Sequence, residues 1–326
     1  MSSLSYLAAA TRAVAEEMRR DDRVWALGED LGRGGVFGQY RGLVDEFGDA
    51  RIADTPISEA TIMGAAVGAA LVGTRPIVEM RFADFALCAV DEMVNQAAKA
   101  RFMFGGQARV PLVIRQPSGM WRSSAAQHSQ SLEAWYTHIP GLVVAAPATP
   151  ADNLGLLKAA VRCDDPVIYI EHKDLWALEG EVPDDGEDVL VPLGRARLAR
   201  AGDDITVVTW SKMVGVAEQA AELAAAQGIA MEVIDLRTLW PWDQEAVFGS
   251  VVKTGRLLVT HEAVQVGGFG AEVAATVAED LSDSLKAPVR RLGAPRTPIS
   301  YAKPLEDQLR ITPERIAAVA AEMLGD

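Results

Sequence analysis

Apolar and polar positions alternate between two kinds of run along the chain. Residues 5–20 place apolar side chains at helical spacing, and Val24–Gly28 is a short run typical of a strand. Residues 58–73 are apolar almost throughout and predict a buried helix, in which Gly64 and Gly68 would let another backbone approach closely. Strands that alternate with helices in this way predict an α/β fold, with a mostly parallel sheet covered by helices on both faces.

The rest of the chain continues this alternation and divides into two halves. In the first half, the sequence predicts strands at Pro76–Met80, Val110–Arg115, Gly141–Ala146 and Pro166–Glu171, and helices at Asp84–Phe104 and Pro150–Arg162. In the second half, it predicts strands at Ile205–Trp210, Ala230–Asp235, Arg256–His261 and Val289–Leu292, and helices at 212–227, 243–253, 268–285 and 313–324. An acidic stretch with little periodicity predicts a linker at residues 176–190, so we expect domains at residues 1–175 and 191–326.

Length, charge and cysteine content narrow the classes of function. The 326 residues are enough for about two domains, and 31 basic against 45 acidic residues give a net charge of −14. This charge argues against nucleic acids and anionic membranes as partners. No apolar run approaches the ~20 residues of a membrane helix, and the N-terminus lacks the pattern of a signal peptide, so we expect a cytoplasmic protein. Cys88 and Cys163 are expected to be reduced core residues.

Two residues stand where α/β proteins gather groups that handle ligands. His128 lies in the loop Gln116–Gln130 between a strand and a helix, and Glu59 opens a very apolar helix. Each residue also has a structural interpretation, because a lone histidine often serves as a hydrogen-bonding group and the helix dipole favours a carboxylate at a helix start. Taken singly, these residues leave both interpretations open.

Longer motifs carry more information than single residues. The chain contains Gly28-Glu29-Asp30, Asp54-Thr55-Pro56-Ile57-Ser58-Glu59, Arg81-Phe82-Ala83-Asp84-Phe85, Gln127-His128-Ser129-Gln130-Ser131-Leu132-Glu133-Ala134 and Asp235-Leu236-Arg237-Thr238-Leu239. In order and spacing, these motifs resemble the β subunits of thiamine diphosphate-dependent 2-oxoacid dehydrogenases, a family with pyruvate, branched-chain and acetoin members. The resemblance covers nearly the whole chain. It implies a transketolase-like pyrimidine-binding domain followed by a transketolase C-terminal-like domain.

The resemblance also implies that the chain carries only half of an active site. In this family an α subunit holds magnesium and the diphosphate through a Gly-Asp-Gly…Asn motif, which this sequence lacks. The implied enzyme is an α₂β₂ heterotetramer that decarboxylates a 2-oxoacid and passes the acyl group to a lipoyl acyltransferase. The substrate stays open among pyruvate, branched 2-oxoacids and acetoin. A non-catalytic assembly scaffold is a further alternative, which the presence of both Glu59 and His128 disfavours.

By resemblance, four residues face the pyrimidine ring of thiamine diphosphate. Glu59 is placed against a ring nitrogen, where a carboxylate favours the protonated state of that nitrogen. Ile57 and Phe85 match positions that pack on the ring. Position 81 also lines it, and here it is Arg81, where relatives often carry a neutral residue. Arg81 either binds a substrate carboxylate or pairs with Glu79 or Asp84 and stays inert.

The remaining implied positions concern acyl transfer and a structural ion. His128 matches the family's active-site histidine, and a side chain that takes up and releases protons near neutral pH suits that role. Trp121 either restricts the size of the acyl group or caps its loop. A potassium-like ion is implied at backbone carbonyls around Leu112, Ala160, Val161, Cys163 and Asp165.

Overall fold

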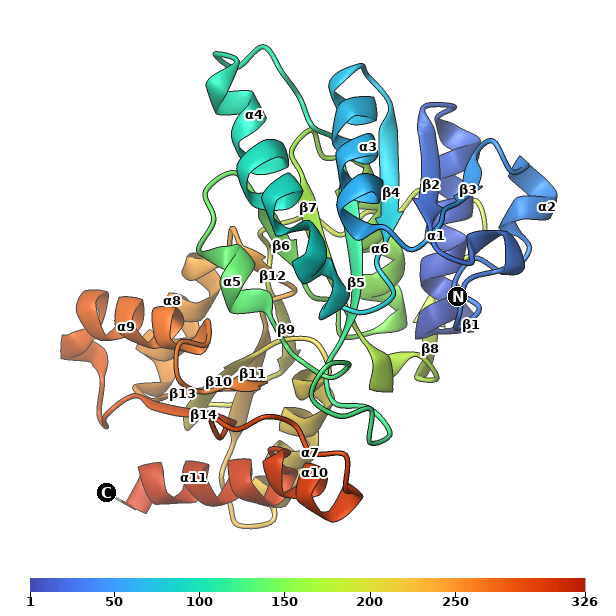
Figure 1. The fold of residues 1–326 in the computed structure, drawn as a ribbon. Coiled ribbons are helices and arrows are strands. Elements are labelled where there is room, and N and C mark those ends of the chain that lie inside the picture. The colour runs from blue at the N-terminus through green and yellow to red at the C-terminus, as the bar shows by residue number, and fades with distance from the viewer. Residues whose placement is uncertain (326) are drawn as a thin grey trace. The chain divides into compact units, whose positions relative to one another are not determined.

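The computed structural model describes residues 1–325 and contains two compact units (Figure 1). The first unit comprises Met1–Ser118 and Trp135–Leu193, and the second comprises Gly119–Ala134 and the chain from Gly194 onwards. Both units contain a mostly parallel sheet with flanking helices, so the predicted α/β class is confirmed. Among the described residues, no helix has both the length and the apolar character needed to cross a membrane.

A parallel sheet forms the centre of the first unit. Its strands are β2 (Val24–Gly28), β3 (Ile52–Asp54), β4 (Arg75–Glu79), β5 (Val113–Ser118), β6 (Val143–Ala145) and β7 (Val167–His172). They lie in the order β6-β7-β5-β4-β2-β3, and every neighbouring pair among them is parallel. The carboxyl ends of all these strands therefore meet at one edge of the sheet, where α/β proteins place their ligand-handling groups.

Helices lie on both faces of this sheet (Figure 1). They are α1 (Tyr6–Arg20), α2 (Leu43–Phe47), α3 (Glu59–Leu71), α4 (Ala98–Met103), α5 (Glu133–Thr137) and α6 (Pro150–Arg162), with the short turns η1 (Leu31–Arg33) and η4 (Lys173–Leu175). Helices α1 and α6 pack together with strand residues in one apolar core. Helix α6 begins where the Thr149 side chain accepts the backbone N–H of Asp152 and Pro150 occupies the first turn, as expected for a capped start.

Four local expectations differ from the structure. Helix α3 is only partly buried, since Gly64, Gly68 and Leu71 are exposed although the sequence predicts a buried helix. The single helix predicted at Asp84–Phe104 is wrong, because the segment changes hydrogen-bond register from the 3-10 turn η2 (Phe85–Ala89) to the π-helix η3 (Glu92–Ala97) and then to α4. The predicted linker contains the strand β8 (Glu179–Val182), which pairs antiparallel with β1 (Ser2–Ser5). Both cysteines are free thiols, but Cys88 is exposed rather than in the core.

The second unit is built on a smaller sheet. Its strands are β9 (Arg197–Arg200), β10 (Ile205–Thr209), β11 (Met231–Asp235), β13 (Leu257–Val264) and β14 (Arg290–Ala294), in the order β14-β13-β10-β11-β9. Only β9 is antiparallel to its neighbour within this sheet of the described chain. Further elements are β12 (Thr238–Trp240), α7 (Met213–Ala225), α8 (Gln244–Thr254), α9 (Gly270–Asp280), η5 (Ser282–Ser284), α10 (Lys303–Leu309) and α11 (Pro313–Gly325). Helices α7 and α11 share an apolar core with the sheet.

Candidate functional site

The candidate site of the first unit lies where β2, β3 and β4 end. Gly28, the last residue of β2, is in register with Asp54 on β3 and with Glu79 on β4. A Cβ at Gly28 would lie 2.7 Å from the carbonyl oxygen of Glu79, so only glycine allows the two strand ends to approach this closely. The residues that follow these strand ends are therefore delivered to the same edge of the sheet.

A cluster of opposite charges links two of these strand ends. Arg81, which follows β4, places Nη2 3.3 Å from Asp30 Oδ2 and Nη1 3.6 Å from Glu29 Oε2. Burial raises the pKa of Glu29, and the negative charge of Glu59 raises it further. Glu59 at the start of α3 is thus close enough to act on Glu29. The cluster therefore consists of three carboxylates, Glu29, Asp30 and Glu59, and the guanidinium of Arg81.

Aromatic side chains lie beside this charged cluster. Phe85 begins η2, which packs against α3, and its ring meets the edge of the Phe82 ring at a centroid distance of 5.3 Å. Phe37 meets Phe82 in the same way at 5.8 Å. Ile57, just before α3, is 74% exposed, so its apolar side chain is open to solvent in the single chain. A carboxylate next to flat apolar surface fits an aminopyrimidine ring, which has N–H donors on its rim and an apolar face.

Four of the predicted site residues, Ile57, Glu59, Arg81 and Phe85, are thus in the first unit, whereas His128 is in the second. His128 lies in the segment Gly119–Ala134, which leaves β5 and groups with the second unit. The backbone N–H of Gly119 donates to the carbonyl of Gln130 at 3.3 Å and closes the segment into a loop. His128 is half-buried, and its backbone N–H donates to the carbonyl of Ala125 at 3.4 Å.

The residues predicted to hold a potassium-like ion lie around the end of α6. Arg75 Nη1 donates to the carbonyl oxygens of Val161 and Cys163, both at 3.0 Å. The carbonyl of Leu112 accepts the backbone N–H of Val167 at 2.8 Å. Each carbonyl oxygen has a second lone pair, so these bonds leave acceptor capacity for a cation. Within the described part of the chain, no group of three His, Cys, Asp or Glu side chains is placed to hold a metal ion.

Sequence reasoning gave no role to Glu29 or Asp30, although both lie in one of the motifs that carried the resemblance. Their position directly after a short apolar strand was the available signal, because polar residues at the carboxyl end of a parallel strand gather at the ligand edge. Their pairing with Arg81 was not predictable, since it depends on β2 and β4 being neighbours in the sheet.

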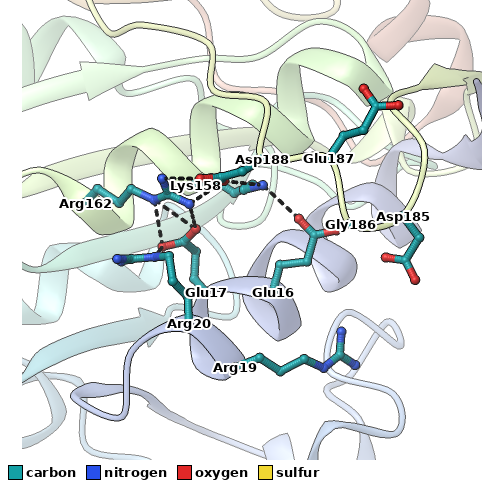
Figure 2. Close-up of a pocket in the computed structure, with 10 residues that line it drawn as sticks. All are labelled: Glu16, Glu17, Arg19, Arg20, Lys158, Arg162, Asp185, Gly186, Glu187 and Asp188. Carbon is teal, nitrogen blue, oxygen red and sulfur yellow. Dashed lines mark hydrogen bonds and ion pairs between the residues drawn. The ribbon is translucent and has the colours of Figure 1, made fainter.

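A separate charged hollow of about 570 Å³ lies among α1, α6 and the loop at 185–188 (Figure 2). Its cations already have protein partners. Arg162 Nη2 lies 2.6 Å from Glu17 Oε1 and 2.5 Å from Asp188 Oδ1, and Lys158 Nζ lies 2.9 Å from Glu16 Oε2. None of the predicted site residues lines this hollow, and its paired charges anchor the loop to the two helices rather than provide free ligands.

The comparisons with known proteins agree with the fold. Residues 2–177 match the family model described as the transketolase pyrimidine-binding domain, and residues 194–316 match the transketolase C-terminal domain. The chain therefore has the domain composition of a transketolase-type protein. A solved structure described as a split-gene transketolase, an inactive β₄ tetramer, superposes with a TM-score of 0.78 at 23% identity and covers 99% of both chains, which supports the fold.

Relatives in sequence show which family of transketolase-type proteins the chain resembles. The 2-oxoisovalerate dehydrogenase subunit beta of Bacillus subtilis is 44% identical over 99% of both chains. The beta subunit of an acetoin:2,6-dichlorophenolindophenol oxidoreductase of the same organism is 43% identical over 98% of this chain and 96% of its own. The mitochondrial pyruvate dehydrogenase E1 component subunit beta of Dictyostelium discoideum is 41% identical over 94% and 87%. The chain belongs to this family of β subunits of 2-oxoacid and acetoin dehydrogenases.

Membership of this family confirms the predicted resemblance and has two direct implications. It implies thiamine diphosphate as the cofactor, with the first unit as the domain that binds its pyrimidine ring. It also implies an α subunit as partner, because the relatives are β subunits of larger enzymes. The carboxylates and aromatic rings at the ends of β2, β3 and β4 fit this cofactor in chemical character.

Proposed function

We propose that this chain is the β subunit of a 2-oxoacid dehydrogenase that oxidatively decarboxylates its substrate and transfers the acyl group to a lipoyl group. The observation that carries the proposal is the cluster of Glu59, Glu29 and Arg81 beside Phe85, at the ligand edge of a pyrimidine-binding domain. When bound, thiamine diphosphate supplies the nucleophilic carbon and the electron sink for decarboxylation. The chain's own residues orient the cofactor and control a proton.

Glu59 controls that proton in the proposed mechanism. Its carboxylate would accept a hydrogen bond from a ring nitrogen of the pyrimidine and favour the protonated state of that nitrogen. Phe85 and Ile57 would provide apolar surface against the ring, and the exposure of Ile57 leaves its side chain open to a ligand or a partner. Arg81 holds Glu29 and Asp30 in place, so its charge is already offset within the protein.

His128 acts on the substrate side in the proposed mechanism. A histidine exchanges protons near neutral pH, which suits protonation of the substrate and transfer of the acyl group to a lipoyl disulfide. The half-buried position of His128 in a loop closed by Gly119 and Gln130 supports a fixed orientation of its ring. Trp121, whose ring stacks with the guanidinium of Arg122 at 4.9 Å, belongs to the same loop.

The partner of this chain is an α subunit, and the proposed assembly is a cytoplasmic α₂β₂ heterotetramer that docks on a lipoyl acyltransferase. Magnesium and the diphosphate would be held mainly by the α subunit, because the magnesium-binding motif is absent from this sequence. The apolar helix α3 supports an interface role, since its Gly64 and Gly68 are exposed and nothing lies within 4 Å of a Cβ placed at Gly68.

A potassium-like ion at the end of α6 is part of the proposal. The candidate ligands are backbone carbonyls around Leu112, Ala160, Val161, Cys163 and Asp165. Arg75 already donates to two of these carbonyls, so the ion would use their remaining lone pairs. Its positive charge would add to that of Arg75 at the negative end of the helix dipole. Exchange of potassium for lithium should lower the thermal stability of the enzyme, and an unchanged melting temperature would remove the ion from the account.

The acetoin reaction is the alternative function. Two acetoin-oxidising relatives are 43% and 44% identical to this chain, as similar as the relative that acts on 2-oxoisovalerate. The β subunit alone does not separate these substrates. A non-catalytic scaffold is less well supported, because the chain keeps both Glu59 and His128.

The experiment is reconstitution of the chain with its α subunit and assay against pyruvate, branched 2-oxoacids and acetoin. Reductive acylation of a lipoyl domain reports the complete reaction, and reduction of an artificial dye reports the steps before acyl transfer. A 2-oxoacid that drives both readouts supports the proposal. Dye reduction by acetoin alone would support the alternative, and no turnover by a complex that binds thiamine diphosphate would support the scaffold.

A further inference from the structure

The loop that carries His128 is fixed at its start by two charged residues of the second unit. The backbone N–H of Met120 donates to Glu262 Oε1 at 2.7 Å, and Arg310 Nη2 donates to the carbonyl oxygen of Met120 at 3.2 Å. Both polar groups of one peptide residue are therefore held by side chains from distant parts of the sequence. Met120 itself is 1% exposed, which further fixes this point of the loop.

The same loop is fixed at its other end. Trp210 Nε1, just after β10, donates to Glu133 Oε1 at 3.2 Å, and both side chains are buried. Burial raises the pKa of Glu133. His128 thus lies between two anchors, and each anchor depends on the sheet of the second unit.

Glu262 and Arg310 are themselves fixed in place. The Glu262 side chain, on β13, is 8% exposed and has Lys212 Nζ at 3.9 Å and Arg310 Nη1 at 4.0 Å as opposite charges. Arg310, just after α10, is paired with Glu306 at 2.7 Å, and Glu306 is 2% exposed. A charged group held from several sides in this way loses little freedom when it binds a backbone group, so it makes a stiff anchor.

The backbone of the loop needs such anchors. Arg122, Ser123 and Ala125 all have positive φ angles of 47°, 56° and 65°, a conformation that costs free energy for residues other than glycine. Residues in this region keep such a conformation only when the surroundings impose it. A loop of this kind would relax if an anchor were removed, and a catalytic side chain on it would lose its orientation.

We infer that Glu262 and Arg310 are positioning residues for His128. This inference rests on the proposed catalytic role of His128, and neither residue is assigned a contact with substrate or cofactor. Through them the transketolase C-terminal-type domain contributes to the reaction itself, in addition to any part in assembly. A displacement of about 1 Å at a reacting group costs roughly 100-fold in rate, so the expected effects are large.

The test compares Glu262→Ala with a matched control in the reconstituted α/β enzyme. Glu232 on β11 is the control residue, because its buried carboxylate also accepts a backbone N–H, from Gly202 at 3.3 Å, and also pairs with a lysine, Lys253. We expect Glu262→Ala to lower kcat about 30- to 100-fold with KM changed less than about threefold. Glu262→Gln keeps an oxygen acceptor and should recover most of that loss. Glu232→Ala should leave kcat unchanged.

Two further readouts separate positioning from a general loss of structure. Hydrogen exchange of peptides from residues 119–134 should accelerate in Glu262→Ala and stay unchanged in Glu232→Ala. In a double-variant cycle, Glu262→Ala should cost little more once His128 is already alanine, because both changes remove the same contribution. An equal loss of kcat in both backgrounds, or unchanged exchange of the loop, would overturn the inference.

The same measurements distinguish failure of the inference from failure of the proposed function. Full activity of His128→Ala would remove the catalytic role of His128, and the exchange rate of the loop would still decide whether Glu262 holds it. An inactive His128→Ala together with a fully active Glu262→Ala would leave the proposed function standing and contradict the positioning role.

Discussion

The guanidinium of Arg81 pairs with the carboxylate of Asp30, with 3.3 Å between Nη2 and Oδ2. The sequence left Arg81 open between a substrate carboxylate and a pair with Glu79 or Asp84. Arg81 instead joins the ends of β2 and β4 through Asp30 and Glu29, and Glu79 lies beside Arg115 at 3.4 Å. Because two carboxylates already offset its charge, Arg81 is better suited to shaping the cofactor site than to binding a substrate anion.

Replacing Arg81 with glutamine should therefore weaken the binding of the cofactor more than the binding of the substrate. We expect the Kd of thiamine diphosphate to rise about tenfold, equivalent to ~1.4 kcal/mol. The reason is that Glu29, in the cluster that shapes the cofactor site, loses the guanidinium that holds it in place and lowers its pKa. The KM for the 2-oxoacid should change less than about threefold, because the substrate has no direct contact with Arg81 in this account. Calorimetry and steady-state kinetics on the α/β enzyme measure the two values. A large rise in KM at unchanged cofactor affinity would assign Arg81 to the substrate carboxylate.

Replacing Glu59 with glutamine should lower kcat by roughly 10²–10⁴-fold with the fold intact, because the amide cannot hold the ring proton as a carboxylate does. Glu314, in the first turn of α11, is the matched control, since it too is a carboxylate at a helix start. Both variants lose the favourable interaction of a carboxylate with the positive end of the helix dipole. Similar kcat values for Glu59→Gln and Glu314→Gln would reduce Glu59 to a helix-start residue.

The buried carboxyl group of Glu79 should make the stability of the protein depend on pH. It is fully buried, accepts from Gln39 Nε2 at 3.1 Å, and shares Arg115 with Glu171, while Tyr40 lies over the same guanidinium. Burial raises the pKa of Glu79 to about 7. This pKa lies above the value in the unfolded chain, so the native state binds the proton of Glu79 more tightly than the unfolded state does. The protonated carboxyl group therefore stabilises the native state at low pH, and this contribution is lost as the pH rises from about 4.5 through 7.

Glu79→Gln should remove this pH dependence. Relative to the wild type, the free energy of unfolding of the variant should increase between pH 5 and pH 8 by up to ~3 kcal/mol, because the variant has no carboxyl group to ionise at position 79. Urea unfolding at a series of pH values measures the difference. Parallel pH profiles for the two proteins would mean that Glu79 is ionised throughout and fully compensated by Arg115.

The ion pairs beneath the charged hollow should differ in their contribution to stability. Arg162→Met removes a bidentate partner from Glu17, which is fully buried, and should lower the free energy of unfolding by about 2 kcal/mol. Arg19→Met breaks the pair with Glu46, in which the two side chains are 52% and 39% exposed, and should cost less than about 1 kcal/mol. Thermal or urea unfolding compares them. Equal losses would contradict the importance given to burial.

Local sequence patterns predicted most strands of the two sheets and most of their long helices, because these elements have their own apolar periodicity, whereas the short strands β3 and β9 were not predicted. The elements that were missed have a different origin. The strand β8 has the polar sequence Glu179-Gly180-Glu181-Val182 and exists through its pairing with β1, far away in the sequence. The segment Asp84–Phe104 has apolar positions close to helical spacing, and this spacing does not separate 3-10, π and α hydrogen-bond registers.

The candidate site was predictable to a similar extent. The motifs indicated Glu59 and His128 as residues of interest, and the structure adds what surrounds them. The partners of Arg81 depend on the order of the strands, and the hold on Met120 depends on Glu262 and Arg310, which come from the other end of the chain. No local pattern encodes contacts between residues this far apart in sequence.

In the proposed enzyme, this chain provides the pyrimidine-binding half of a site that it shares with the α subunit. The most direct measurement is calorimetric binding of thiamine diphosphate with magnesium, first to the chain alone and then to the chain co-expressed with its α subunit. We expect tight binding only in the co-expressed sample. Tight binding by the isolated chain would mean that it holds the diphosphate as well, and would contradict the assignment of a divided site.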